Sequence, residues 1–229
     1  MAASRSEPAS GADRLRAIVP LAALGLAAAV PALRPWILVG VVAGAGVAIA
    51  RDAPVRWVWA AAVPVALSLT FGGLPAPTAA LDGSDCADPL SPVATWRAIE
   101  ALVVVTALAI LAVVLRATPA SLSLRRPARR WERRAALGFL VSGPLALVLG
   151  PVLAEPFFGD VGYRFLLGAL APALVFAAAN GLMEELIYRG ALLGWAARVV
   201  GVWPAMAGQA VVFGLAHSGS DVIGLQLPL

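Results

Sequence analysis

Long hydrophobic runs, separated by short charged or glycine- and proline-rich segments, dominate the pattern of this chain. A helix that crosses a bilayer needs about 20 mostly apolar residues, and several runs approach that length. The pattern predicts an all-α fold, a polytopic transmembrane helical bundle with about seven to eight membrane helices. We expect these helices at residues 18–33, 36–50, 55–71, 99–115, 135–154 and 165–188, followed by segments 190–200 and 205–217.

Composition supports a membrane location. Hydrophobic residues make up 61% of the chain, and the mean hydropathy of +0.88 exceeds that of soluble domains. We therefore predict an integral, multi-pass cell membrane protein in contact with the lipid bilayer. All 17 basic residues are arginines, and they gather near the ends of the predicted helices. Their charge is expected to set topology, and we expect no nucleic-acid partner.

The charged residues alternate between successive loops. Three arginines precede the first predicted helix, two separate the second from the third, and seven lie between residues 116 and 134. The intervening loops carry Asp82, Asp85 and Asp88, and then Glu155 and Asp160. Because cytoplasmic loops are enriched in arginine, we predict that the N-terminus and the basic loop are cytoplasmic.

Three regions are expected along the chain. Residues 1–13 are small and polar and are predicted to be disordered, and residues 14–134 are predicted to form the N-terminal transmembrane helices. Residues 135–229 are predicted to form the functional helical region. A single cysteine, Cys86, excludes an internal disulfide and a cysteine-based metal cluster.

The residues with chemical potential lie in the third region. Glu184 and Glu185 are adjacent within segment 165–188, Arg189 follows one turn later, and His217 is the only histidine. Residues four apart share a helix face, so Glu185 is expected to pair with Arg189, while Glu184 has no cation on its own helix. A charge within a span costs at least about 2.5 kcal/mol and is usually functional. The charge alternation places both glutamates toward the cytoplasmic half of the membrane.

Helix lengths indicate that Glu184 and His217 can meet. We consider two helical arms that meet at a turn near Val202. At a helical rise of 1.5 Å per residue, the arm from Glu184 would be about 27 Å long and the arm back to His217 about 22 Å. A helical hairpin would therefore bring the His217 imidazole to within about one helical turn of the Glu184 carboxylate, measured along the helix axis. Asn180 and Tyr188 share the helix face of Glu184.

A carboxylate and an imidazole that face each other in an apolar site can hold and deprotonate a water molecule. The same two side chains, Glu184 and His217, are also candidate ligands for a divalent metal such as zinc, which normally takes at least three protein ligands. The residues alone leave both roles open. They also leave open a small transporter or channel with Glu184 in a proton path.

At these residues the chain resembles the CPBP family of membrane proteins, which comprises CAAX prenyl endoproteases of the Rce1 type and bacterial Abi, or bacteriocin-immunity, relatives. The first family motif, Glu-Glu-x-x-x-Arg, matches Glu184, Glu185 and Arg189. The second, Phe-x-x-x-His, matches Phe213 and His217. The resemblance covers roughly residues 135–229.

The resemblance implies an intramembrane endopeptidase, usually labelled a metalloprotease, that cleaves a membrane-associated peptide or protein near the cytoplasmic face. By the same resemblance, Glu184 would be the catalytic base that activates water, and His217 would help to hold that water. Glu185 and Arg189 would order the site. The family has a further helix with another histidine, whereas this chain has one histidine. We therefore expect a C-terminally incomplete member, with a non-catalytic Abi or immunity-type membrane protein as the alternative.

Overall fold

The computed structural model describes residues 10–72, 74, 92–122, 124, 132–133, 136–138, 140–145 and 170–218. Every regular element within these ranges is helical, in agreement with the predicted all-α class. Seven α-helices have bounds within the described part, residues 136–138 and 140–145 are helical as well, and the predicted count of membrane helices stays a prediction. Cys86, the loop 155–160 and the residues after Ser218 lie outside the described residues, as do residues 1–9 and most of segment 135–154.

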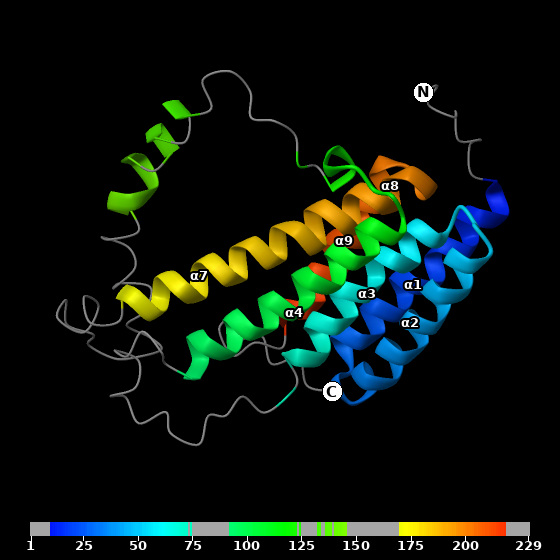
Figure 1. The fold of residues 1–229 in the computed structure, drawn as a ribbon, viewed down its shortest axis with the longest axis horizontal. Helices are drawn as coiled ribbons and strands as arrows, with labels where there is room; N and C mark the ends of the chain where they lie inside the picture. The colour runs from blue at the N-terminus through cyan, green and yellow to red at the C-terminus, as the bar shows by residue number, and fades with distance from the viewer. Residues whose placement is uncertain are drawn as a thin grey trace.

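The helices follow one another with short connections where the chain is described. They are α1 (Gly11–Ala29), α2 (Arg34–Ala50), α3 (Arg56–Phe71), α4 (Pro92–Val114), α7 (Leu170–Glu184), α8 (Gly194–Val200) and α9 (Val202–Ser218). Two short 3₁₀ turns, η1 (Pro31–Leu33) and η3 (Pro119–Leu122), and a π-helix, η4 (Glu185–Leu193), complete the set. Figure 1 shows α4 and α7 side by side, with α3 packed against α4 and with α1 and α2 on the other side of α3.

Three helical stretches of the described chain are long and apolar enough to cross a membrane. They are Pro31–Ala50, Ala94–Val114 and Leu170–Val200. The 16-residue α3 is apolar but shorter than a full span. These stretches support a membrane protein. That every predicted segment crosses the bilayer stays a prediction.

The first helix begins at Gly11, seven residues before the predicted residue 18. Ser10 accepts a hydrogen bond from the backbone N–H of Asp13, and the Asp13 carboxylate accepts one from the backbone N–H of Ser10. This reciprocal capping box satisfies two N–H groups that would otherwise lack partners at the helix start. Residues 11–13, expected to be disordered, are therefore helical.

The predicted division between segments 165–188 and 190–200 is not present. The chain continues from α7 through η4 into α8 as one helical stretch, Leu170–Val200. The second of these predicted segments starts at Gly190, and glycine costs about 1 kcal/mol in a helix interior. The buried face continues past Gly190, with Ile187, Ala191 and Trp195 all in the core, and this burial outweighs the cost of the glycine.

Helix α3 lies at the centre of the bundle and contacts α1, α2, α4, η4 and α8. Its buried residues are mostly small, including Ala60, Ala61 and Ala62, which lets neighbouring backbones approach closely. Gly44 of α2 packs directly on the Trp59 ring, where an added Cβ would overlap the indole. These contacts hold α3 against its neighbouring helices.

A candidate active site between α4, α7 and α9

Helices α7 and α9 bring Glu184 and His217 together. Glu184 is the last residue of α7, and His217 lies in the last turn of α9. The chain reverses at Gly201, whose φ of 89° is readily adopted only by glycine. Glu184 Oε1 lies 3.6 Å from His217 Nε2. The helical hairpin inferred from the arm lengths therefore forms.

Aromatic packing and one hydrogen bond orient the imidazole. His217 Nδ1 lies 2.9 Å from the carbonyl oxygen of Phe213, and because a carbonyl can only accept, we assign the proton to Nδ1. The Phe213 ring lies 4.2 Å from the imidazole and 5.0 Å from the Tyr188 ring, centroid to centroid. Tyr188 is buried. This packing directs Nε2 toward Glu184.

A third helix contributes a cation that the sequence pattern did not connect with Glu184. Arg97 of α4 places Nη2 3.6 Å from Glu184 Oε1, the same oxygen that faces His217. The arginine beside Glu184 therefore belongs to another helix than Glu184. It lies 87 residues earlier in the chain, and only the packing of α4 on α7 reveals it.

Arg97 is held by a polar network inside the helix bundle. Its Nη1 donates to Glu100 Oε2 at 2.5 Å, and its Nε donates to Asn180 Oδ1 at 2.7 Å. The hydroxyl of Ser68 donates to the other Glu100 oxygen at 2.8 Å. Glu100 is almost completely buried, with 1% of its side chain exposed. Asn180, which was predicted to share the face of Glu184, thus contacts the same guanidinium.

The other two predicted site residues lie on the exposed side of the helix. Glu185 and Arg189 form the expected ion pair across one turn. Their side chains are 57% and 70% exposed, compared with 21% for Glu184. Their predicted role in ordering the site stays a prediction, because the described contacts join them to each other and not to Glu184.

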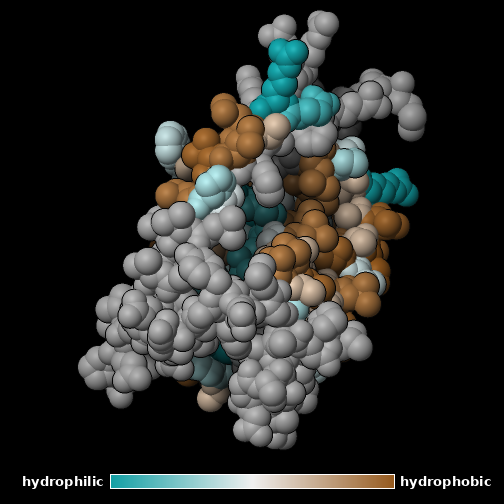
Figure 2. Space-filling view, turned by 90° about the vertical axis from the view of Figure 1, so that its left-hand side faces the viewer, coloured by the Kyte–Doolittle hydropathy of each residue, from teal (hydrophilic) through white to brown (hydrophobic). Residues whose placement is uncertain are grey.

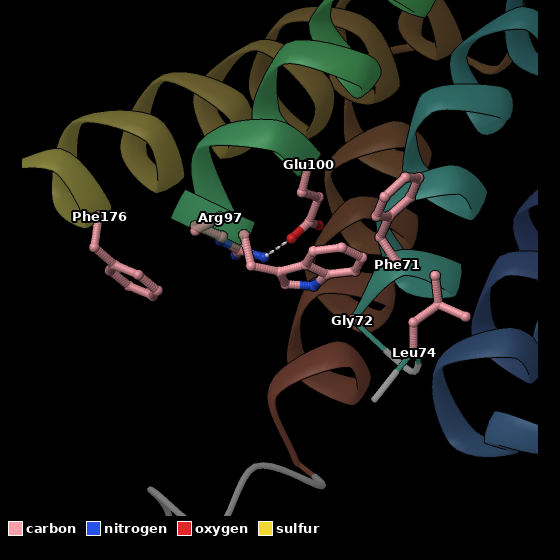
Figure 3. Close-up of a pocket in the computed structure, with 7 residues that line it drawn as sticks. Phe71, Gly72, Leu74, Arg97, Glu100 and Phe176 are labelled. Atoms are coloured by element: carbon pink, nitrogen blue, oxygen red, sulfur yellow. Dashed lines mark hydrogen bonds and ion pairs between the residues drawn. The ribbon is translucent and has the colours of Figure 1, made fainter. Parts of the chain in front are cut away.

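A pocket of about 290 Å³ opens beside Arg97 (Figure 3). Phe71, Gly72 and Leu74 form one wall, Trp96 and Glu100 come from α4, and Phe176 comes from α7. Figure 3 shows Arg97 between Phe176 and Glu100, with its guanidinium toward Glu100. Figure 2, which faces the side where α4 and α7 begin, shows hydrophilic residues recessed between hydrophobic areas. The pocket therefore combines apolar walls with the charged side chains of Arg97 and Glu100.

The described residues fit a divalent metal poorly. Glu184 and His217 supply two candidate ligands, and no group of three histidine, cysteine or acidic residues suited to a metal occurs among the described ranges. The guanidinium of Arg97 also lies 3.6 Å from the Glu184 oxygen that a metal would need, and a dication there would be repelled.

The site lies far from the N-terminal end of α1. Ala17 of α1 packs in one buried cluster with Ala205 of α9, and further along Gly25 faces Leu215. Both helices therefore run in the same direction, and His217 lies near the C-terminal end of α1. A cytoplasmic N-terminus would place the site in the non-cytoplasmic half of the bundle.

Two predictions therefore cannot both hold, namely a cytoplasmic N-terminus and glutamates in the cytoplasmic half of the membrane. The conflict arises because segment 165–188 was expected to end four residues after Glu184. The helical stretch instead continues to Val200, which moves its end about 18 Å further from the glutamates at 1.5 Å per residue.

Fold and site together define a helical protein with membrane-spanning candidates and a partly buried carboxylate–imidazole pair. Residues 165–228 match the family model described as Rce1-like, type II CAAX prenyl endopeptidase. This match confirms the resemblance predicted from the glutamate and histidine motifs, and it includes Glu184 and His217. Searches of the curated proteins and of the solved structures found no match to the chain.

Proposed function

We propose that this protein is a membrane endopeptidase in which Glu184 activates the attacking water. One observation carries the proposal: Glu184 and His217 meet at 3.6 Å within the segment that matches the Rce1-like family model. That separation is longer than a direct hydrogen bond. It suits a water molecule that donates one hydrogen to the carboxylate and the other to Nε2.

The proposed reaction is hydrolysis of a peptide bond. Glu184 removes a proton from the water as the water oxygen adds to the carbonyl carbon, and the carbonyl π electrons move onto the carbonyl oxygen. When this tetrahedral intermediate collapses, the carbon–nitrogen bond breaks and Glu184 returns the proton to the leaving amine. His217 holds the water, and the Glu185–Arg189 pair orders the helix that carries Glu184.

A membrane-associated peptide or protein is the proposed substrate class. Arg97, which lies 3.6 Å from Glu184, lines a pocket with apolar walls, and the described helices include three candidate membrane spans. A peptide held at the bilayer would reach these walls without first being dissolved in water. The description of the family model names an endopeptidase. We extend to this chain only the cleavage of a peptide bond.

Glu184→Gln tests this proposal because it keeps the size of the side chain and removes the base. Purified protein in detergent would be incubated with quenched fluorescent peptides that carry apolar residues on both sides of the bond. We expect the variant to lose at least about 100-fold in kcat, the usual contribution of a general base. Glu132→Gln, which changes an exposed carboxylate outside the site, is the matched control.

Equal cleavage by Glu184→Gln and the wild type would remove Glu184 from the chemistry. An absence of cleavage by the wild type in this assay would favour the non-catalytic, immunity-type alternative. A genetic readout then separates the two, because that alternative predicts a silent Glu184→Gln phenotype.

A further inference from the structure

Arg97 places a permanent positive charge beside the proposed base. Its Nη2 and the imidazole Nε2 each lie 3.6 Å from the same Glu184 oxygen, so the three side chains surround one small volume. An arginine guanidinium stays positively charged throughout the working pH range. Arg97 lies outside residues 165–228, the segment that matches the family model.

The guanidinium also has donors available for a substrate. Arginine has five N–H groups, and the hydrogen bonds from Arg97 to Glu100 and Asn180 use three of them within the described part of the chain. The side chain is 21% exposed, lines the pocket and lies 3.6 Å from Glu184 Oε1. A peptide carbonyl in that pocket can therefore reach it.

The network around Arg97 fixes the charge before any substrate arrives. Glu100 holds one end of the guanidinium, Asn180 holds the Nε edge, and Ser68 orients Glu100 in turn. A charge held in this way needs no reorganisation when an oxyanion forms, and such preorganised donors make a large contribution to catalysis.

We propose that Arg97 is a further catalytic residue of this endopeptidase, one that stabilises the oxyanion formed on the scissile carbonyl. The inference rests on the function proposed above. As the water oxygen bonds to the carbonyl carbon, the π electron pair moves to the carbonyl oxygen, and Arg97 donates a hydrogen bond to that oxygen. When the carbon–nitrogen bond breaks, the electron pair returns to re-form the carbonyl. Arg97 keeps all of its protons throughout.

The test separates this role from a structural one with two variants. Arg97→Met alone leaves the Glu100 carboxylate buried without its cation, which can unfold the protein. The double variant Arg97→Met/Glu100→Gln removes both charges, and Glu100→Gln alone measures what the second substitution contributes. Arg97→Lys keeps a charge but not the planar fork of donors. Each variant is assayed with the same fluorescent peptides, and its melting temperature is measured in detergent.

We expect the double variant to melt near the wild type, to keep a similar KM and to lose about 100-fold or more in kcat. Arg97→Lys should lose less in kcat than the double variant, with KM unchanged. If the double variant does not fold, a fall of about tenfold in kcat for Arg97→Lys with unchanged KM supports the role, on the same principle. A double variant or an Arg97→Lys variant that cleaves at the wild-type rate overturns it.

The inference and the proposed function fail in different ways. If Glu184→Gln is inactive while the double variant is fully active, the endopeptidase stands and Arg97 has no catalytic role. If Glu184→Gln is as active as the wild type, or the wild type cleaves none of the peptides, the proposed function fails and takes the inference with it.

Discussion

Charged side chains in this protein fall into two environments that have very different energetic consequences. The Arg97–Glu100 pair is largely enclosed, with 21% and 1% of the two side chains exposed. The Arg189–Glu185 pair is open, with 70% and 57% exposed. A buried charge that loses its partner keeps its desolvation cost, whereas an exposed charge is rehydrated. The two pairs therefore form an internal comparison.

Removing the cation from each pair should give clearly different losses of stability. We expect Arg97→Met to lower the free energy of unfolding by about 3 kcal/mol, because Glu100 is left uncompensated. The matched Arg189→Met change should cost less than about 1 kcal/mol. Denaturant unfolding in detergent micelles measures both, and equal losses at the two positions would contradict this assignment.

The sequence identified Glu184 and His217 but not Arg97 or Glu100. The first two lie in motifs with a defined spacing, and helix geometry was enough to bring them to one level. Arg97 lies two residues before the predicted helix 99–115, and an arginine at that position usually marks the end of a membrane span. The useful signal was Glu100, a carboxylate inside an apolar helix three residues from an arginine. Such a residue needs a partner.

The element that carries the site is an unusual helix. The π-helix η4 follows Glu184 directly and runs from Glu185 to Leu193, and π-helical turns occur often at functional sites. Gly190 within η4 packs against η3, where an added Cβ would lie 3.1 Å from the backbone oxygen of Leu122. Glycine at this position therefore allows a close approach of two segments.

Alanine substitutions at two glycines of this helical stretch should have opposite effects. We expect Gly190→Ala to destabilise the protein by about 1–3 kcal/mol, because the backbone of Leu122 must move away. Gly181→Ala meets no atom within 4 Å and should be neutral or stabilise by up to about 1 kcal/mol through helix propensity. Melting temperatures of the two variants give the comparison. A Gly190→Ala variant as stable as Gly181→Ala would show that the close contact has no consequence.

At the scale of the whole molecule, the arginine-rich end of the bundle, which carries Arg14, Arg16, Arg51 and Arg56, lies opposite the candidate site. The turn at Gly201 packs near Ala17 and Val55 through the neighbouring Ala205, whereas His217 lies near the C-terminal end of α1. Orientation in the membrane therefore decides which compartment the site faces. A cytoplasmic N-terminus is the orientation that the arginine distribution favours.

Single-cysteine labelling tests that orientation. In a Cys86→Ser background, we expect a membrane-impermeant maleimide to label Leu33→Cys in intact cells. Trp203→Cys should be labelled only after the membrane is disrupted, because it lies at the arginine-rich end. Both native side chains are exposed, at 36% and 79%. The reverse labelling pattern would place the N-terminus outside and the site in the cytoplasmic half.

The sequence by itself determined the helical class, the apolar stretches and the pairing of the two motifs across a hairpin. These features depend on local periodicity, on helix rise and on residues close in the chain. Only the tertiary structure joined Arg97, Glu100 and Ser68 to Glu184, continued the helix through Gly190 and placed the site relative to the arginine-rich end. Those features depend on which helices pack together, and long-range packing between membrane helices leaves no periodic signal in one sequence.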